Sequence, residues 1–489
     1  MNSSYSLSDP SLLASKCYVN GTWVEAASGR RFAVNNPSTL AKIATCPEFD
    51  AADTQAAIVS AREGLIAFRD TAPRVRARLL RRLSDLMLEN LEDLAHIITI
   101  ENGKPLADAR TEVAYAAGFF EWFSEEAARI YGDAIPASNR SCRIITLKEP
   151  VGVCGLIVPW NFPAAMVTRK VGPALAAGCS VVVKAPAEAP LSALALAELA
   201  HRAEIPKGVF NVITTSENTA LVGKVLTSHP IVKKVSFTGS TGVGKLLMSQ
   251  SSSTLKKLSF ELGGNAPFIV FDDADLQIAL RGLMACKFRI SGQTCVCANR
   301  ILVQRRVYEK FLRLVVEAVG KFVVGDGLEE RVTHGPLIHE RAVKKVDEHV
   351  RDALAKGARL LHGGQRLDAL GPNFFDLTVM ADMTTDMLIC REETFGPVAA
   401  IFPFDTEEEA VGLANNTDVG LAGYFFSKDI SRCWRVAEAL EVGMVGVNTG
   451  AISDPAAPFG GVKESGFGRE GSKYGVDEYV TTKMIMMGL

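Results

Sequence analysis

The fold is decided in a stretch that begins with residues 151–158, Val-Gly-Val-Cys-Gly-Leu-Ile-Val. A short apolar run of this kind is typical of a buried strand. Helices and apolar runs then alternate: a helix that ends at Gly178, a strand at 180–185 (SVVVKA), a helix at 191–203 (LSALALAELAHRA), and strands at 208–214 (GVFNVIT) and 231–239 (IVKKVSFTG). Continuous Val and Ile strands between helices predict a parallel sheet covered on both faces, as in nucleotide-binding domains.

The flanking regions predict further regular structure. Short strands are expected within 17–50, where Asn20-Gly21 marks a tight hairpin, and amphipathic helices within 53–101 and 104–130. Pro105 suits a first helical turn, and 141–149 is a further strand. After Leu255 the alternation restarts with strands at 257–264 and 266–273, a helix at 274–288, and a strand and helix within 300–322.

The composition excludes several classes of function. Of 489 residues, 48% are hydrophobic and 22% are charged, and the net charge is -2. This is a globular composition, and nothing in it favours binding to nucleic acid or to an anionic membrane. No uninterrupted apolar run approaches the ~18 residues that a membrane span needs, so none is expected.

The cysteines and histidines are scattered along the chain. No pair of the ten cysteines has CxxC spacing, and the seven histidines form no HExxH motif and no Cys/His cluster. Thiols distributed in this way are typical of a reduced intracellular protein, and no metal site is expected. The beginning, MNSSYSLSDPSLLASK, has no apolar core behind basic residues. We therefore expect no targeting peptide and a cytoplasmic location.

Residues 289–297 (Arg-Ile-Ser-Gly-Gln-Thr-Cys-Val-Cys) present a candidate nucleophile. Cys295 is surrounded by small and polar residues, as expected for a thiol at the mouth of a cleft. The thiolate is the reactive form, so Cys295 needs a group that deprotonates it and a donor that holds the oxyanion formed on attack. A lone cysteine is more often an inert core residue, so the other motifs have to decide between the two interpretations.

Residues 235–245 (VSFTGSTGVGK) form a strand, a glycine-rich turn and a helix start, an arrangement that places backbone N–H groups at a phosphate. Gly239, Gly242 and Gly244 do not have GxGxxG spacing. The P-loop pattern GxxxxGK[ST] is matched up to Lys245, but Leu246 stands where the magnesium-binding hydroxyl belongs. A P-loop NTPase is therefore a poor alternative, and a turn with no ligand is another.

Two more motifs supply the groups that Cys295 needs. Asn161 lies in Pro-Trp-Asn-Phe-Pro (159–163), directly after a buried strand, and offers a neutral N–H donor to an oxyanion. Glu261 lies at a strand end before Gly263 and Gly264, where a general base is expected. Each motif taken alone is also compatible with an ordinary turn.

Together, in this order, the motifs resemble those of the NAD(P)-dependent aldehyde dehydrogenase superfamily. The matching segments, spread over residues 150–470, are PWNFP (159–163), FTGSTGVG (237–244), ELGG (261–264), GQTC (292–295), EETFGP (392–397) and PFGGVKESGFGRE (458–470). The resemblance implies an aldehyde dehydrogenase-like α/β fold. Its expected parts are a Rossmann-type nicotinamide-cofactor domain (1–130 and 150–256), an α/β catalytic domain (257–455) and a β oligomerisation arm (131–149 and 471–489).

The resemblance also implies a mechanism. Cys295 attacks the aldehyde, the Asn161 side chain and the Cys295 backbone N–H hold the oxyanion, and a hydride leaves a thioester. Glu261 activates the water that hydrolyses this thioester, which disfavours a CoA-acylating enzyme. Lys170 and Glu470 match positions that support proton movement.

For the cofactor, the resemblance assigns Lys184 to the adenosine ribose. It assigns Trp160, Gly239, Ser240 and Gly244 to the phosphates, and Glu393 and Phe395 to the nicotinamide end. NAD-preferring relatives carry a Glu three residues after the Lys184 position. Here Ala187 occupies it, and Glu188 follows. We therefore expect NADP as the cofactor, with NAD also accepted if Glu188 takes over that function.

The substrate is expected to be a small aldehyde with a distal carboxylate. Arg169 and Arg289 are placed to enter the substrate tunnel, and two arginines suit a carboxylate. Both residues and Ser453 match the carboxylate pocket of succinate-semialdehyde dehydrogenases, which FRxxGQTCVC (288–297) also resembles. A surface salt bridge is the alternative for each arginine.

Other interpretations stay open at this point. They are another semialdehyde dehydrogenase, a non-phosphorylating glyceraldehyde-3-phosphate dehydrogenase, and a catalytically silent structural member. Cys297 is a candidate redox switch through a disulfide with Cys295, and a small apolar filler is the alternative. The family implies dimers or tetramers that exchange the terminal arm.

Overall fold

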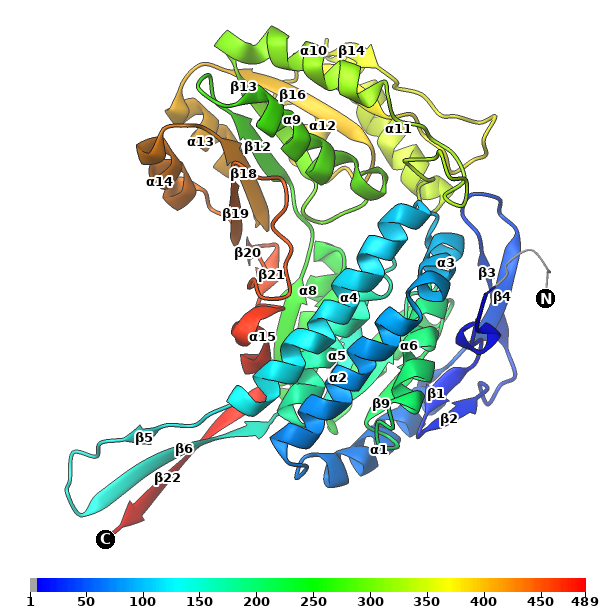
Figure 1. Ribbon diagram of the computed structural model, residues 1–489, viewed down its shortest axis with the longest axis vertical. Coiled ribbons are helices and arrows are strands. Elements are labelled where there is room, and N and C mark those ends of the chain that lie inside the picture. Colours follow the sequence, from blue (N-terminus) through cyan, green and yellow to red (C-terminus); the bar gives the residue numbers. More distant parts are fainter. Residues whose placement is uncertain (1–6) are drawn as a thin grey trace.

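The computed structural model describes residues 7–489, and the first of its two large sheets lies behind the long N-terminal helices (Figure 1). Its strands lie in the order β2-β1-β9-β8-β7-β10-β11-β21, and the run from β9 to β11 is parallel, which confirms the predicted sheet. The bounds are β1 (Cys17–Val19), β2 (Thr22–Val24), β7 (Val153–Ile157), β8 (Ser180–Lys184), β9 (Phe210–Ile213), β10 (Val232–Thr238), β11 (Lys257–Glu261) and β21 (Gly466–Phe467).

Alternating side chains on the central strands bind helices to both faces of this sheet. On β8, Val181 and Val183 join the core beneath α5 and α6, whereas Val182 joins the core beneath α1 and α7. The helices are α1 (Ala51–Phe68), α2 (Pro73–Glu89), α3 (Leu91–Asn102), α4 (Leu106–Glu126), α5 (Ala165–Ala177), α6 (Leu191–Arg202), α7 (Thr219–Ser228) and α8 (Thr241–Ser251). The sequence analysis did not anticipate α7.

The second sheet has the order β14-β15-β16-β13-β12-β18-β19, and all neighbours except β14 and β15 are parallel. Its strands are β12 (Ala266–Val270), β13 (Ala298–Gln304), β14 (Arg359–His362), β15 (Thr378–Ala381), β16 (Val398–Phe404), β18 (Ala422–Phe426) and β19 (Met444–Val447). The surrounding helices are α9 (Leu276–Leu283), α10 (Tyr308–Val319), α11 (Glu340–Ala355), α12 (Leu388–Arg391), α13 (Glu407–Asn415) and α14 (Ile430–Ala439).

One strand belongs to a different sheet from the one that the sequence suggested. Residues 257–264 were expected to open the second α/β unit, but β11 pairs in parallel with β10 of the first sheet, with Thr238 opposite Glu261. The chain passes to the second sheet only after Gly264, where β12 begins. The domain limits themselves stay predictions.

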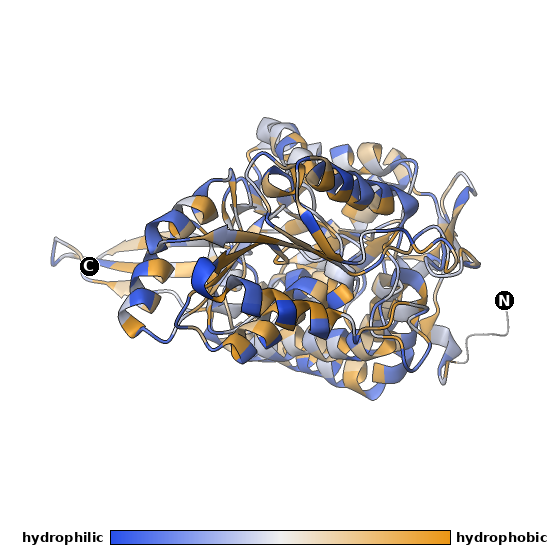
Figure 2. Cartoon of the chain, turned by 90° about the horizontal axis from the view of Figure 1, so that it is seen from above, coloured by the Kyte–Doolittle hydropathy of each residue, from blue (hydrophilic) through white to orange (hydrophobic). Residues whose placement is uncertain are grey.

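A three-stranded sheet projects from the body as an arm (Figure 1). It contains β5 (Ala134–Ile135), β6 (Cys142–Pro150) and β22 (Val480–Gly488), and β22 pairs with β6 along its whole length. Four apolar residues of β22, Met484, Ile485, Met486 and Met487, are exposed. The projecting strands carry orange, hydrophobic segments (Figure 2). The remaining elements are β3 (Arg31–Asn35), β4 (Lys42–Pro47), β17 (Val419–Gly420), β20 (Val462–Lys463) and α15 (Ser472–Asp477).

Within residues 7–489, no helix combines the length and the apolar character needed to cross a membrane.

Candidate active site

Three neighbouring parallel strands place the predicted motifs at one edge of the first sheet. Strand β7 ends at Ile157 and leads into the loop that carries Asn161, and β10 ends at Thr238 before the glycine-rich turn. Strand β11 ends at Glu261. The carboxyl ends of parallel strands meet at the same edge, so residues distant in the sequence converge there.

Cys295 reaches this edge from the second sheet through a strained turn. Helix α9 continues into a π-helical segment at Met284–Phe288, a feature frequently found at functional sites. Ile290 and Ser291 then both adopt φ of 52°, and strain of this kind persists only where the surroundings enforce it. A Cβ at Gly292 would lie 2.1 Å from the backbone oxygen of Gly396. Only glycine fits there, so the turn is fixed in front of the nucleophile.

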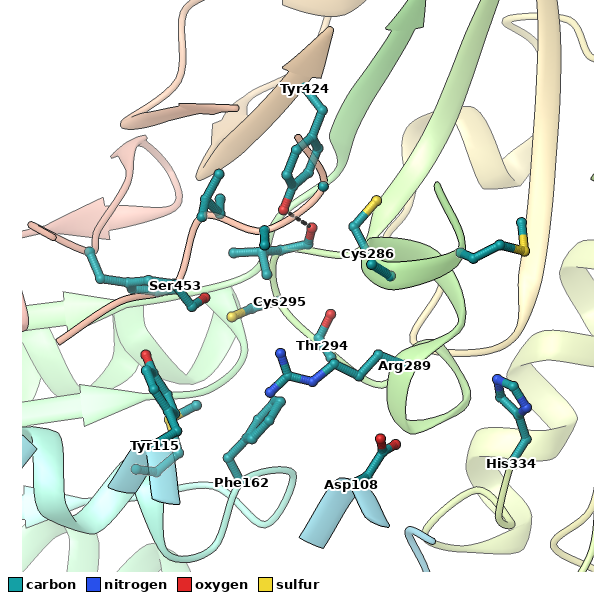
Figure 3. Close-up of a pocket in the computed structure, with 18 of the residues that line it drawn as sticks. Asp108, Tyr115, Phe162, Cys286, Arg289, Thr294, Cys295, His334, Tyr424 and Ser453 are labelled. Atoms are coloured by element: carbon teal, nitrogen blue, oxygen red, sulfur yellow. Dashed lines mark hydrogen bonds between the residues drawn. The ribbon is translucent and has the colours of Figure 1, made fainter. Parts of the chain in front are cut away.

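The Cys295 side chain lines two cavities at once, one of about 370 Å³ and one of about 230 Å³. The larger cavity extends towards Arg289 and Ser453, and Figure 3 shows the thiol and the Arg289 guanidinium pointing into it. The smaller cavity is lined by residues at and after the ends of β7, β10 and β11 and by two residues of the loop between α12 and β16. They are Pro159, Trp160, Asn161, Thr238, Gly239, Ser240, Glu261, Leu262, Gly263, Glu393 and Phe395. A molecule in either cavity therefore reaches the same sulfur atom.

Glu261 is the carboxylate coupled to the thiol. Burial raises the pKa of Cys295 well above its ordinary value, and the charge of Glu261 adds to this, whereas Arg169 lowers it. Burial likewise raises the pKa of Glu261, opposed by Arg169. The site thus disfavours a negative charge on the Cys295 sulfur and on the Glu261 carboxyl group alike, so each group holds its proton more tightly than in water.

Asn161 is held by a buried ion pair that the sequence analysis missed. Its side-chain Nδ2 donates to the Gln293 backbone oxygen at 3.1 Å, and its own backbone oxygen accepts from Lys104 Nζ at 2.7 Å. Lys104 pairs with Glu112, and both side chains are fully buried. Glu112 also accepts from the backbone N–H of Ala164 at 2.9 Å, at the start of α5. The charged residue Glu112 on an otherwise apolar helix face was the feature of the sequence that could have indicated this buried ion pair.

Arg169, Lys170 and Glu470 form a second buried charge network. Arg169 pairs with Glu261 at 3.1 Å and also with Glu470, which in turn pairs with Lys170. Lys170 Nζ also donates to Ser236 Oγ at 2.9 Å. Burial opposes the charge on Glu470, but Arg169 and Lys170 outweigh it and hold the pKa of that carboxyl below its ordinary value. The network therefore keeps Glu470 ionised beside the catalytic edge.

The second predicted arginine has different surroundings. Arg289 is half-buried, and its guanidinium lies 4.9 Å from the centre of the Phe162 ring (Figure 3). Within residues 7–489 no ion pair and no side-chain hydrogen bond is formed by Arg289, although Asp108 is a charged neighbour. Arg289 is thus the available cation of the larger cavity. The larger cavity also has lining residues that the sequence analysis did not name, among them Asp108, Tyr115, His334 and Tyr424.

The smaller cavity fits the nicotinamide end of a dinucleotide. Thr238 Oγ1 is buried without a hydrogen-bond partner in the described part of the chain, and no side chain caps the N-terminus of α8 there. Both are unsatisfied groups of the kind that a phosphate or ribose satisfies. Burial raises the pKa of Glu393 to about 8. Trp160 and Phe395 contact edge to face at 5.7 Å and form an apolar wall.

Several predicted residues lie outside both cavities: Lys184, Ala187, Glu188, Gly244, Lys170, Glu470 and Cys297. Lys184 ends β8, where burial lowers its pKa and the nearby Glu188 opposes that shift. The Cys297 thiol is buried, with Lys287 Nζ at 3.3 Å. Within residues 7–489 no cluster of metal-ligating side chains is found.

Known proteins resemble the chain closely. Residues 23–485 match the model described as Aldehyde dehydrogenase family. The NADP(+) succinate-semialdehyde dehydrogenase 1 of Schizosaccharomyces pombe is 57% identical over 98% of this chain and 96% of its own. The glutarate-semialdehyde dehydrogenase of Pseudomonas aeruginosa is 53% identical, covering 99% of each chain. A crystal structure of succinate-semialdehyde dehydrogenase from Burkholderia pseudomallei has a TM-score of 0.98 and 54% identity, covering 99% of this chain and 100% of that one.

Proposed function

The chain belongs to the aldehyde dehydrogenase family, and we propose that it oxidises succinic semialdehyde to succinate with NADP as the electron acceptor. The observation that carries this proposal is the position of Cys295, which lines both cavities. Within residues 7–489, Arg289 in one cavity forms no ion pair and Thr238 Oγ1 in the other has no hydrogen-bond partner. The aldehyde and the hydride acceptor can thus meet at one sulfur atom. The names of the relatives from Schizosaccharomyces pombe and Burkholderia pseudomallei support the substrate.

In the larger cavity, the distal carboxylate of the substrate accepts charge-assisted hydrogen bonds from Arg289. Ser453 lines the same cavity and adds a hydroxyl donor. Because Arg289 forms no ion pair within the described residues 7–489, substrate binding there breaks no existing ion pair. Phe162, beneath the guanidinium, holds that side chain in place by a cation–π contact.

The covalent steps follow from the groups around Cys295. The thiol proton passes to Glu261, and the sulfur forms a bond to the aldehyde carbon. The carbonyl oxygen becomes an oxyanion, held by the Asn161 Nδ2 donor once it leaves Gln293 and by the Cys295 backbone N–H. The nicotinamide, when bound in the smaller cavity, supplies the hydride acceptor that converts this adduct to a thioester. Glu261 releases the thiol proton to solvent and is ionised again. It then takes a proton from water, the water oxygen bonds to the carbonyl carbon, and the C–S bond breaks to release succinate and the Cys295 thiolate.

For the cofactor, the proposed ribose ligands are Lys184 at the adenosine end and Glu393 at the nicotinamide end. The proposed phosphate contacts are Trp160, Gly239, Ser240 and Gly244, and Phe395 is proposed to lie beside the nicotinamide ring. Ala187 leaves no carboxylate at the third position after Lys184 to repel a 2′-phosphate. NADP is therefore the proposed cofactor, with NAD as a weaker alternative.

The arm is the proposed oligomerisation surface. Met484, Met486 and Met487 on β22 are between 46% and 58% exposed in the single chain, which is unusual for apolar residues in a regular strand. A dimer or tetramer that pairs this sheet with a second copy would cover them. The scattered free thiols support a cytoplasmic location.

Initial rates on a substrate panel test the proposal. With NADP⁺, succinic semialdehyde should be oxidised with a higher kcat/KM than glutaric semialdehyde, glyceraldehyde-3-phosphate or butanal, and Cys295→Ala should abolish every activity. Arg289→Ala should raise the KM for succinic semialdehyde by about 10- to 100-fold, the loss of a charge-assisted hydrogen bond, and leave butanal unchanged. Arg306→Ala, at an arginine with an 83% exposed side chain, is the matched control. Equal KM changes for both aldehydes in Arg289→Ala would overturn the substrate assignment.

A further inference from the structure

The loop that carries two of the proposed cofactor residues lies against helix α11. This loop, residues 392–396, connects α12 to β16, and its residues Glu393 and Phe395 line the smaller cavity. Thr394 stands between them in the sequence and is fully buried. The loop thus presents its neighbouring side chains to the cavity while the Thr394 hydroxyl is held in the protein interior.

The partner of that hydroxyl is a buried histidine. His349, on α11, is fully buried, and its Nδ1 lies at a hydrogen-bonding distance of 2.8 Å from Thr394 Oγ1. Burial and the charge of Lys345 lower the pKa of His349, and Glu392 opposes that shift. The imidazole is therefore neutral at pH 7. A hydroxyl group both donates and accepts, so either tautomer of the neutral ring can form this bond.

Two further contacts join α11 to the ends of the same loop. Lys345 forms an ion pair with Glu392 at its start. At its end, a Cβ on Gly396 would lie 2.3 Å from Val346 Cγ2, so the backbone there rests directly on α11. The bond from His349 holds the middle of the loop, which is the part that carries the two cofactor residues.

The other ring nitrogen shows that His349 is not an ordinary core residue. Within residues 7–489, His349 Nε2 has no hydrogen-bond partner, and the nearest carboxylate oxygen, Glu392 Oε2, lies 3.6 Å away. Burying a polar group without a partner is unfavourable, and an apolar side chain in the same space would avoid that cost. The bond from Nδ1 to Thr394 accounts for an imidazole at this position.

We propose that His349 is a positioning residue for the cofactor: its hydrogen bond to Thr394 fixes the loop so that Glu393 and Phe395 face the nicotinamide end. The inference rests on the proposed function, which makes those two residues cofactor ligands. His349 lines neither the larger nor the smaller cavity, so it acts through the loop and does not touch the cofactor itself.

Calorimetric titration with NADP⁺, without aldehyde and at pH 9, where the Glu393 carboxyl with its pKa of about 8 is ionised, tests the proposal. His349→Leu should raise the Kd by at least about five-fold, the effect of losing one buried hydrogen bond. His349→Asn places an amide atom where Nδ1 lies and should restore most of the affinity. Val350→Ala, at a buried residue of the same helix, is the control for lost packing and should leave the Kd nearly unchanged. Equal Kd values in His349→Leu and Val350→Ala would overturn the proposal.

Substitutions of Thr394 test the same bond from its other end, and they decide the matter if His349→Leu does not fold. Thr394→Val keeps the shape of the side chain without the hydroxyl and should raise the Kd for NADP⁺ as much as His349→Leu does. Thr394→Ser keeps the hydroxyl and should bind normally. Because both substitutions break one bond, the double variant His349→Leu/Thr394→Val should bind no more weakly than either single variant. A normal Kd in Thr394→Val, or full additivity in the double variant, would contradict the proposal.

Hydrolysis of p-nitrophenyl acetate separates positioning of the loop from a general loss of structure. This activated ester acylates Cys295 without a cofactor, and the burst of p-nitrophenol measures that step. In His349→Leu the burst should match the wild type, because the contact of Val346 with Gly396 remains. A burst that falls in proportion to the NADP⁺ affinity would show general damage and overturn the positioning role.

Glu393→Gln, titrated in parallel at pH 9, separates this inference from the proposed function. Weaker NADP⁺ binding in Glu393→Gln but not in His349→Leu would overturn the inference and leave the proposed function intact. Normal binding in both variants would remove Glu393 from the proposed cofactor site and overturn both. If the protein oxidises another aldehyde in place of succinic semialdehyde, the proposed substrate is wrong, while the Kd values still decide the role of His349.

Discussion

Lys104 Nζ donates to the backbone oxygen of Asn161 at 2.7 Å, so a buried cation on the loop before α4 fixes the loop that carries this proposed oxyanion donor. The same cation pairs with Glu112, which holds the N-terminus of α5. Burial lowers the pKa of Lys104 and Glu112 opposes that shift. One ion pair thereby joins α4, the Asn161 loop and α5.

Replacing Lys104 should destabilise the protein. Lys104→Met leaves the Glu112 carboxylate buried and unpaired, which costs about 3–5 kcal/mol of unfolding free energy. The denaturation midpoint in urea measures the change. Lys245→Met, which removes the exposed Lys245–Glu464 pair, is the control and should cost at most about 1 kcal/mol. Similar losses in the two variants would contradict the structural role of Lys104.

Removing the Asn161 amide should slow the chemistry without weakening binding. Asn161→Ala loses one of the two proposed oxyanion donors, so kcat should fall by about 10²–10³-fold while KM changes little. Steady-state rates measure both, and Asn416→Ala, at an exposed asparagine, serves as the control. A kcat within a few-fold of wild type would show that Asn161 does not hold the oxyanion.

Cofactor binding should depend on pH through Glu393. Burial raises the pKa of this carboxyl to about 8, so it is neutral below that pH and ionised above it. A ribose hydroxyl donates best to the ionised form, so the Kd for NADP⁺ should fall as pH rises from 7 to 9. Calorimetric titration without aldehyde measures it. In Glu393→Gln the dependence should disappear, and its persistence there would assign it to another group.

The cofactor preference should change at Ala187. Ala187→Glu places a carboxylate where a 2′-phosphate is expected, so kcat/KM for NADP should fall by about 10- to 100-fold relative to NAD. Ala187→Gln, which has the same shape without the charge, should change the ratio far less. An unchanged ratio in Ala187→Glu would mean that the loop holding Glu188 already sets the preference.

The proposed redox switch depends on Cys297. Peroxide should inactivate the wild type by forming a Cys295–Cys297 disulfide. A thiol reductant should restore activity by reducing that disulfide. Burial raises the pKa of Cys297, and Lys287 Nζ, at 3.3 Å from the Cys297 sulfur, opposes that shift. Lys287 thereby favours the thiolate that would attack oxidised Cys295. Cys297→Ala should lose the recovery, while Cys286→Ala should retain it. Recovery that persists in Cys297→Ala would remove Cys297 from the process.

The positions of most strands along the chain and the motifs at their ends were accessible from the sequence, because both are properties of neighbouring residues. The Val-rich runs predicted most strands of the first sheet. The motifs located Asn161 and Cys295 in loops and Glu261 at a strand end, where the structure has them. The sheet to which β11 belongs was not accessible. The run 257–261 (Lys-Leu-Ser-Phe-Glu) alternates polar and apolar residues, a pattern that a strand of either sheet could have. Its partner β10 is identified only by the register, in which Thr238 lies opposite Glu261.

The sequence by itself determined that this chain builds a parallel α/β fold and presents one thiol, one amide and one carboxyl group at strand ends and loops. Periodicity and glycine-rich turns are properties of neighbouring residues, so they can be found without coordinates. Only the tertiary structure decided which charges surround each of the two predicted arginines. Arg169 and Arg289 look alike in the sequence, but Glu261 lies 92 residues from Arg169 and neutralises it. The energy of a charge depends on what is packed around it, which long-range contacts alone determine.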